Sequence, residues 1–172
     1  GLWPNFLSGS YGEPYMGDFG SNVTAGKSGL LLDRMGCHLL ATVRGAGKLG
    51  KNIDILSAAA NAAYFDSEGN LQSAFFTDYG INSGMVEGWS NINNKLRDLQ
   101  TFDKPFALVG AAEYGDGYHS VSITNVYVAP NGGFEVLTQE TSRNGIRQKR
   151  QYGLQNSNRK NYYQIDRLYY LY

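Results

Sequence analysis

The sequence contains a single cysteine among its 172 residues, only four prolines and no net charge. One cysteine cannot form a disulfide within the chain, so the stability of the fold does not depend on an oxidising compartment. Fifteen basic residues balance fifteen acidic ones, which argues against broad electrostatic attraction to nucleic acid or to an anionic membrane. No apolar run approaches the roughly 20 residues that a membrane helix needs. We therefore expect neither a nucleic-acid partner nor a membrane segment.

Glycine and tyrosine are abundant, with 22 and 13 copies, and the length suits one globular domain. Residues 1–29 are rich in Gly, Ser, Asn and Pro and are predicted to form an irregular N-terminal arm. Apolar residues at helical spacing then predict three helices. The first runs from Cys37 to Gly45 or Gly47, the second from Ile53 to about Phe65, and the third from about Val86 to Leu99.

Strand patterns follow the predicted helices. Short strands are predicted over 105–112, 118–128 and 134–138, and the turn at 129–133 should join the last two as a hairpin. The aromatic segment 162–172 is predicted to add a further strand. Helices followed by an antiparallel sheet indicate an α+β fold, with residues 30–172 as one domain.

Cys37 directly follows Gly36 at the start of the first predicted helix. The N-terminus of a helix carries a partial positive charge, which favours the thiolate and lowers the pKa of a cysteine. His119 opens an alternating segment far downstream. A thiol and an imidazole that are distant in sequence can meet in a fold as nucleophile and base. Cys37 and His119 are therefore our predicted catalytic residues.

The order of these parts resembles the papain-like cysteine peptidases, and within them the branch related to bacterial peptidases that trim double-glycine leader peptides. The resemblance covers residues 30–142. A Gly-Cys pair opens a helix, a later helix leads into the strand Lys104-Pro105-Phe106-Ala107-Leu108-Val109, and a loop ends in His119. It implies a papain-like fold, with N-terminal helices packed on an antiparallel sheet. It further implies a hydrolase that acts on peptide or amide bonds of a protein or peptide substrate without a cofactor, or a deamidase or acyltransferase variant.

In that family a third residue follows the histidine by one hairpin and orients the imidazole. Counting through the predicted hairpin places this role at Gln139 or Glu140, because an amide oxygen and a carboxylate can both accept the ring N–H. We favour Glu140. The family's oxyanion-hole glutamine has no counterpart before Cys37. Asn22 is the donor that we assign in its place, with Ser28 and Asp33 as alternatives.

The opening Gly1-Leu2-Trp3-Pro4-Asn5 is similar to the segment that follows the core of RHS-repeat proteins, which ends in an Asp-Pro-x-Gly-Leu motif before a variable C-terminal toxin domain. This similarity implies an effector of a polymorphic toxin that is secreted or delivered into a target cell. It also implies a cognate immunity protein as a partner.

Two other classes of function stay open. A nuclease toxin would use His119 with Arg147 or Lys149 and would be indifferent to Cys37, although the neutral overall charge argues against it. A catalytically silent papain-like module would bind a partner, as the missing oxyanion glutamine suggests. Cys37 and His119 could then be packing residues. His38 points away from its helix neighbour Cys37, and the histidines and cysteine lack the spacing of a zinc site, so we predict no metal.

Overall fold

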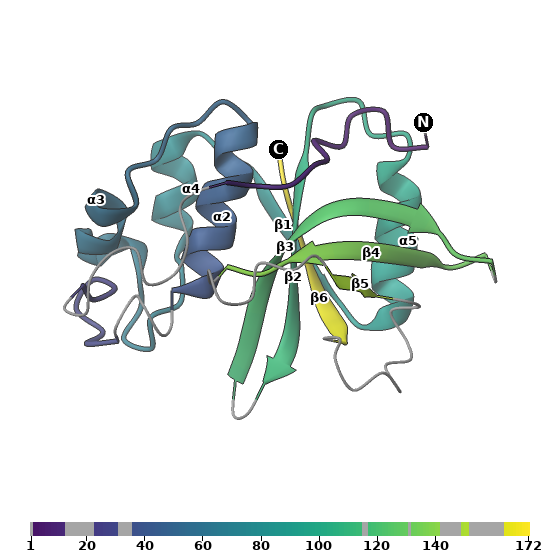
Figure 1. Cartoon of the computed structure of the whole chain (residues 1–172). Coiled ribbons are helices and arrows are strands. Elements are labelled where there is room, and N and C mark those ends of the chain that lie inside the picture. Colours follow the sequence, from purple (N-terminus) through teal and green to yellow (C-terminus); the bar gives the residue numbers. More distant parts are fainter. Residues whose placement is uncertain are drawn as a thin grey trace.

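The computed structural model describes residues 2–12, 23–30, 36–114, 117–130, 132–141, 149–151 and 164–172, which form four α-helices and one six-stranded sheet (Figure 1). The helices are α2 (Cys37–Lys48), α3 (Ile55–Ala60), α4 (Ser73–Tyr79) and α5 (Trp89–Leu99), with a 3₁₀ turn at Ala62–Tyr64. The strands are β1 (Ser83–Glu87), β2 (Ala107–Tyr114), β3 (Gly117–Val128), β4 (Phe134–Gln139), β5 (Lys149–Gln151) and β6 (Ile165–Leu171). The sheet order is β1-β6-β2-β3-β4-β5, and every neighbouring pair is antiparallel.

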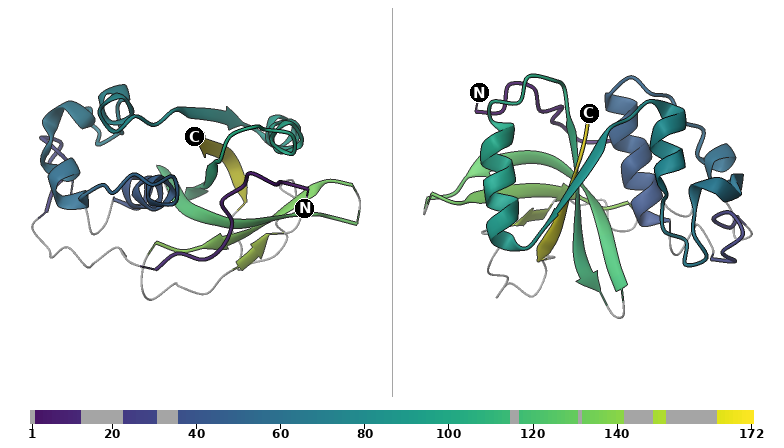
Figure 2. Two further views of the ribbon diagram at one scale, coloured as in Figure 1. Left: turned by 90° about the horizontal axis from the view of Figure 1, so that it is seen from above. Right: turned by 180° about the vertical axis from the view of Figure 1, so that it is seen from behind.

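Helices and an antiparallel sheet make this an α+β fold, as the sequence predicts. The predicted hairpin is present, because Val128 pairs with Phe134 and the register continues to Ser122 and Gln139. The predicted C-terminal strand is also present as β6, which lies between β1 and β2. In Figure 1, α2, α3 and α4 gather on one side of the molecule and α5 lies at the other side behind the sheet, as the view from behind in Figure 2 also shows.

Two predicted helices are wrong in their extent. The second ends at Ala60 because Asn61 takes an extended backbone and its side chain accepts a hydrogen bond from the Ala63 N–H, which starts the 3₁₀ turn instead. In the third, Val86 belongs to strand β1. Gly88 separates strand from helix with a φ of 84°, a conformation that glycine adopts readily. Helix α4 and strand β5 are additional elements that the sequence patterns do not predict.

Strand β2 is covered on both faces, because successive side chains of a strand point to opposite sides. Ala107 and Val109 pack with Ala41 and Ala46 of α2. Phe106, Leu108 and Ala112 pack with the α5 residues Ile92, Leu96 and Leu99. Helix α2 approaches the sheet closely at Gly45, where an added Cβ would lie 2.8 Å from Leu171 Cδ1 and 3.3 Å from the Cβ of Ala107. Helix α2, which begins with Cys37, is thus fixed directly against the sheet that carries His119.

The first described segment of the N-terminal arm, residues 2–12, is irregular but firmly attached to the fold. The Leu7 N–H donates to the Phe106 carbonyl at 2.9 Å, and the Gly9 N–H donates to the Thr124 carbonyl at 2.8 Å. Lys48, at the end of α2, donates to the carbonyl oxygens of Leu7 and Gly9. These attachments lie at the end of α2 that is remote from Cys37.

Candidate active site

Cys37 is the first residue of α2 and follows Gly36, which has no side chain to cap the helix. No acidic residue occupies the first turn, so no carboxylate competes with a thiolate for the positive end of the helix. The residue is 9% exposed. It lines a cavity of about 280 Å³ between the helical side, with Phe65 and Leu71, and the sheet side, with Tyr118 and Arg167. The thiol is therefore sheltered but accessible from this cavity.

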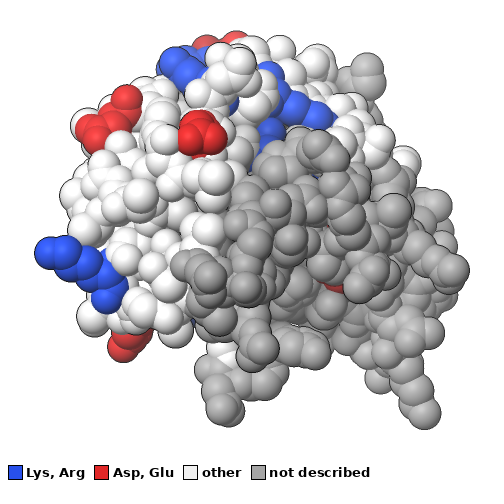
Figure 3. All heavy atoms as spheres, turned by 60° about the vertical axis from the view of Figure 1, so that its left-hand side comes forward, with Lys and Arg blue, Asp and Glu red and all other residues white. Residues whose placement is uncertain are grey.

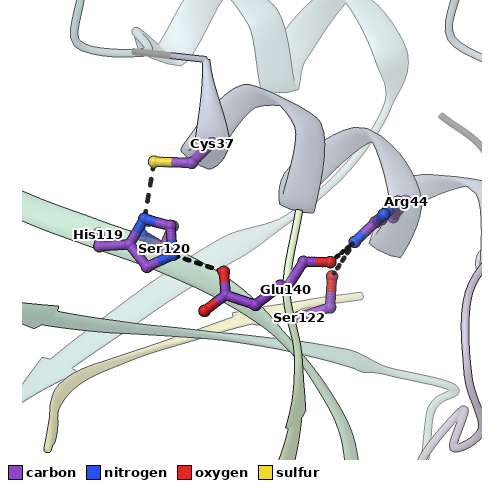
Figure 4. Close-up of polar contacts among 6 residues, drawn as sticks. All are labelled: Cys37, Arg44, His119, Ser120, Ser122 and Glu140. Carbon is purple, nitrogen blue, oxygen red and sulfur yellow. Dashed lines mark hydrogen bonds and ion pairs between the residues drawn. The ribbon is translucent and has the colours of Figure 1, made fainter. Parts of the chain in front are cut away.

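Strand β3 supplies two contacts to the thiol. The side chain of His119 is hydrogen-bonded to Cys37, and the Ser120 N–H donates to Cys37 Sγ at 3.5 Å. The close-up in Figure 4 shows the imidazole between the thiol and Glu140, with a different ring nitrogen toward each. Because Nε2 faces Glu140, the nitrogen that faces the sulfur is Nδ1.

Glu140 completes a row of three side chains. Its Oε2 lies 2.7 Å from His119 Nε2, and the carboxylate is almost fully buried. The hairpin register explains the contact: Ser122 of β3 pairs with Gln139, the last residue of β4, so the next residue emerges beside His119. The structure thus brings together Cys37, His119 and Glu140.

The arrangement favours a charged pair. Burial opposes a thiolate, but the hydrogen bonds from His119 and from the backbone of Ser120 and His38, with the charge of His119, hold the pKa of Cys37 below its ordinary value. Burial likewise opposes an imidazolium, yet hydrogen bonds to Cys37 and Glu140 and their charges raise the pKa of His119 to about 9. Both shifts favour a thiolate beside an imidazolium, and two groups this close titrate as a coupled pair.

The other predicted site residues have different places. Gln139 does not reach the imidazole: its Oε1 accepts from the Tyr11 N–H at 2.8 Å and its Nε2 donates to the Tyr11 carbonyl at 2.7 Å. Ser28 donates to the Ala25 carbonyl. Asn22 and Asp33 lie outside the described residues, as does Arg147 of the nuclease alternative. Glu140 alone of the two candidates is thus the partner of His119.

His38 lines the same cavity as Cys37. Its Nδ1 lies 2.9 Å from Ser120 Oγ, and its ring centroid is 4.5 Å from that of Tyr169. Burial and the charge of Arg167 lower the pKa of His38 to about 4, so the ring is neutral at pH 7. His38 therefore lies beside the Cys37 thiol but is not its acid–base partner.

Arg44 is a residue near the site that the sequence patterns do not single out. It is 4% exposed and donates from Nη1 to the Glu140 carbonyl at 3.0 Å and to Ser122 Oγ at 3.3 Å (Figure 4). The available signal was a charged residue inside the apolar run of a predicted helix, seven positions after Cys37. Seven positions are about two helical turns, which places both residues on one face.

Metal ligands, membrane-spanning helices and surface charge add little evidence about function. Within the described ranges, no three His, Cys, Asp or Glu side chains are grouped to hold a metal ion. No described helix combines the length and the apolar character that crossing a membrane requires. On the helical side of the molecule, the described charged residues are scattered and of both signs (Figure 3).

The sequence matches no model of a known protein family and no curated protein.

Proposed function

We propose that the chain is a papain-like, cysteine-dependent hydrolase that acts on peptide or amide bonds. One observation carries the proposal: the thiol of Cys37, the imidazole of His119 and the carboxylate of Glu140 stand in hydrogen-bonded order, with 2.7 Å between the last two. A packing cysteine needs no such order. The pKa values of Cys37 and His119 shift in opposite directions, which adds to it, because titratable groups with perturbed pKa values are typical of catalytic sites.

The geometry supports an acyl-transfer mechanism. The Cys37 thiolate attacks the carbonyl carbon, and the backbone N–H of Cys37 at the start of α2 is placed to stabilise the developing oxyanion. The His119 imidazolium then gives its proton to the departing nitrogen, which leaves an acyl group on sulfur. Neutral His119 next takes a proton from water as the water attacks the thioester. The C–S bond breaks, the carboxylic acid leaves, and the thiolate of Cys37 again faces the imidazolium of His119.

Glu140 has a supporting part in this cycle. Its carboxylate accepts the Nε2–H of His119 and so keeps Nδ1 turned toward the sulfur. It also stabilises the imidazolium that forms in the resting enzyme. The cavity beside Cys37, near the lower end of the range of roughly 300–1,000 Å³ that ligand pockets span, suits a short segment of substrate next to the reacting carbonyl.

The biological role that we propose is that of a toxin effector with a cognate immunity protein, which rests on the similarity of the first five residues to the segment after an RHS core. The nuclease alternative has less support, because the hydrogen bonds of His119 to Cys37 and Glu140 are those that a cysteine mechanism needs. The silent binding module remains the competing proposal, since no side-chain oxyanion donor is identified among the described residues.

The test compares the parent protein with Cys37→Ala on a bacterial cell lysate. Mass spectrometry then reads new peptide N-termini, which report hydrolysis, and side-chain masses, which report deamidation or acyl transfer. We expect one of these products from the parent and none from Cys37→Ala. Products that persist in Cys37→Ala would refute a cysteine mechanism. If neither protein yields a product, even at a concentration equal to that of the lysate proteins, the result favours the catalytically silent binding module.

A further inference from the structure

Arg44 is a buried cation in the helix that carries the nucleophile, and the proposed chemistry does not use it. Only 4% of the residue is exposed. Burying a charge costs free energy that close hydrogen bonds only partly offset, so a guanidinium at this depth calls for an explanation. A residue that merely filled space in α2 would be apolar, like its neighbours Val43 and Ala46.

The contacts of Arg44 join the three segments that supply the proposed active site. Arg44 belongs to α2, which begins with Cys37. Its Nη1 reaches Ser122 of β3, the strand of His119, at 3.3 Å, and the carbonyl oxygen of Glu140 at 3.0 Å. Figure 4 shows the guanidinium on the side of Glu140 that faces away from the imidazole. One side chain thus links helix, strand and the residue that supplies the carboxylate.

Glu140 needs this support because it lies just beyond the sheet. Gln139 is the last residue of β4, so the ladder with β3 does not extend to Glu140. The bond from Arg44 fixes the backbone carbonyl of Glu140. The preceding residue, Gln139, is fixed as well, because its side-chain amide is hydrogen-bonded to the backbone of Tyr11 and its backbone pairs with Ser122. With Gln139 anchored before it and its own carbonyl bonded to Arg44, Glu140 has its carboxylate 2.7 Å from His119.

We infer that Arg44 is a positioning residue for the Cys37–His119–Glu140 row: it holds the backbone of Glu140 so that the carboxylate meets the imidazole. Arg44 does not touch the reacting atoms. The inference rests on the proposed function, because it assigns a role within that site. The carboxylate then aligns and stabilises the imidazolium, which in turn stabilises the thiolate.

The test follows the ionisation of Cys37, measured as the rate of alkylation by iodoacetamide against pH, in Arg44→Met and Arg44→Lys. Arg97→Met is the matched control, because Arg97 also lies on a helix but contacts Asn94 Oδ1 and the ring of Phe134, not the row of Cys37, His119 and Glu140. We expect Arg44→Met to shift the inflection upward and to lower kcat/KM by roughly 100-fold, as misplacement by about 1 Å does, mainly through kcat. Arg44→Lys should recover part of both effects. Arg97→Met should change neither.

A double variant separates positioning from general destabilisation. If Arg44 acts through Glu140, adding Arg44→Met to Glu140→Gln should change the inflection little, because interacting residues are not additive. The inference is refuted if the shifts of the inflection caused by Arg44→Met and Glu140→Gln add in the double variant. It is also refuted if Arg44→Met folds and its inflection is unchanged. Should Arg44→Met fail to fold, Arg44→Lys and Ser122→Ala decide: both should shift the inflection upward, and a parent-like profile in both refutes the role.

The failure of the inference is distinct from the failure of the proposed function, because alkylation requires no substrate. A parent protein whose thiol titrates at its ordinary value refutes the coupled pair, and the role of Arg44 with it. A perturbed parent profile that the Arg44 variants leave unchanged refutes the role of Arg44 alone.

Discussion

Removing His119 should raise the pKa of the Cys37 thiol above its ordinary value. Four interactions favour the thiolate against burial: the hydrogen bond and the charge of His119, and the backbone hydrogen bonds of Ser120 and His38. His119→Ala removes the first two. Burial, the largest single influence on this pKa, then opposes the thiolate with only the two backbone groups against it. The parent inflection should lie below the ordinary value and that of His119→Ala above it.

The expected size of each effect decides whether to measure the alkylation rate at one pH or the midpoint of the pH profile. A thiol with a pKa of 9.0, its ordinary value, is about 1% ionised at pH 7, and each further unit lowers this fraction about tenfold. The remaining thiolate becomes about threefold more nucleophilic per unit, because nucleophilicity follows basicity with a coefficient of about 0.4–0.5. The rate at pH 7 therefore changes only about threefold per unit. The midpoint of the pH profile moves by the full shift.

Alkylation by iodoacetamide should accordingly be followed from pH 4 to pH 10, with modification of Cys37 verified by mass spectrometry. Glu140→Gln should fall between the parent and His119→Ala, because the amide still accepts the Nε2–H but no longer offers a charge to the imidazolium. Glu87→Gln is the matched control, since it removes a carboxylate that pairs with Arg167 rather than with His119. The reasoning is refuted if His119→Ala leaves the midpoint in place, or if Glu140→Gln lowers it.

Three further predictions follow from the same structure. Hydrolysis should show a bell-shaped pH profile of kcat/KM, rising as Cys37 ionises below its ordinary pKa and falling near pH 9 as His119 loses its proton; a single rising limb up to pH 10 would contradict the pair. The pKa of His38 is lowered to about 4 in the folded protein, whereas in the unfolded chain His38 takes up a proton below about pH 6.5. Only the unfolded chain is protonated at His38 between these two values, so the folded protein keeps its stability above about pH 6.5 and loses it as the pH falls toward 4. Chemical denaturation at pH 7 and pH 4 should show His38→Gln losing less than the parent by on the order of 2–3 kcal/mol, and equal losses would contradict burial of the neutral ring. Gly45→Ala should destabilise the fold by about 1–2 kcal/mol through the clash with Leu171, whereas Gly47→Ala, in the same helix with open space around it, should stabilise it by about 0.5–1 kcal/mol; thermal unfolding that ranks the two in the opposite order would contradict the close packing of α2.

The sequence predicts the grouping of Cys37, His119 and Glu140 better than it predicts the bounds of the helices. A glycine before a cysteine, and a histidine at the start of an alternating strand, are local patterns that suggest a nucleophile and a base. The length of the predicted hairpin then limits the residue that orients the imidazole to Gln139 or Glu140, and only the strand register decides between the two. Gln139 ends the ladder and bonds to Tyr11, while Glu140 faces the imidazole.

The features that escaped prediction depend on partners distant in sequence. Val86 fits a helical stripe equally well, but β1 forms because it pairs with β6, as in the contact of Val86 with Leu168. The role of Arg44 depends on a backbone carbonyl, which any residue at position 140 would offer, so no residue type marks it. By contrast, the break at Asn61 had a local cause, since Asn competes with the helix through its own side-chain hydrogen bond.

The position of β6 in the sheet also sets the order in which the protein can be assembled. Strand β1 pairs only with β6 among the described strands, and β6 pairs with β2 on its other side. A ribosome makes β1 and β2 before residues 165–171 emerge, so β1 and one edge of β2 must wait for a partner that is synthesised later. Pairings this distant in sequence form slowly. Since Gly45 of α2 packs against Leu171 of β6, the helix that begins with Cys37 should reach its final packing only after β6 has been inserted.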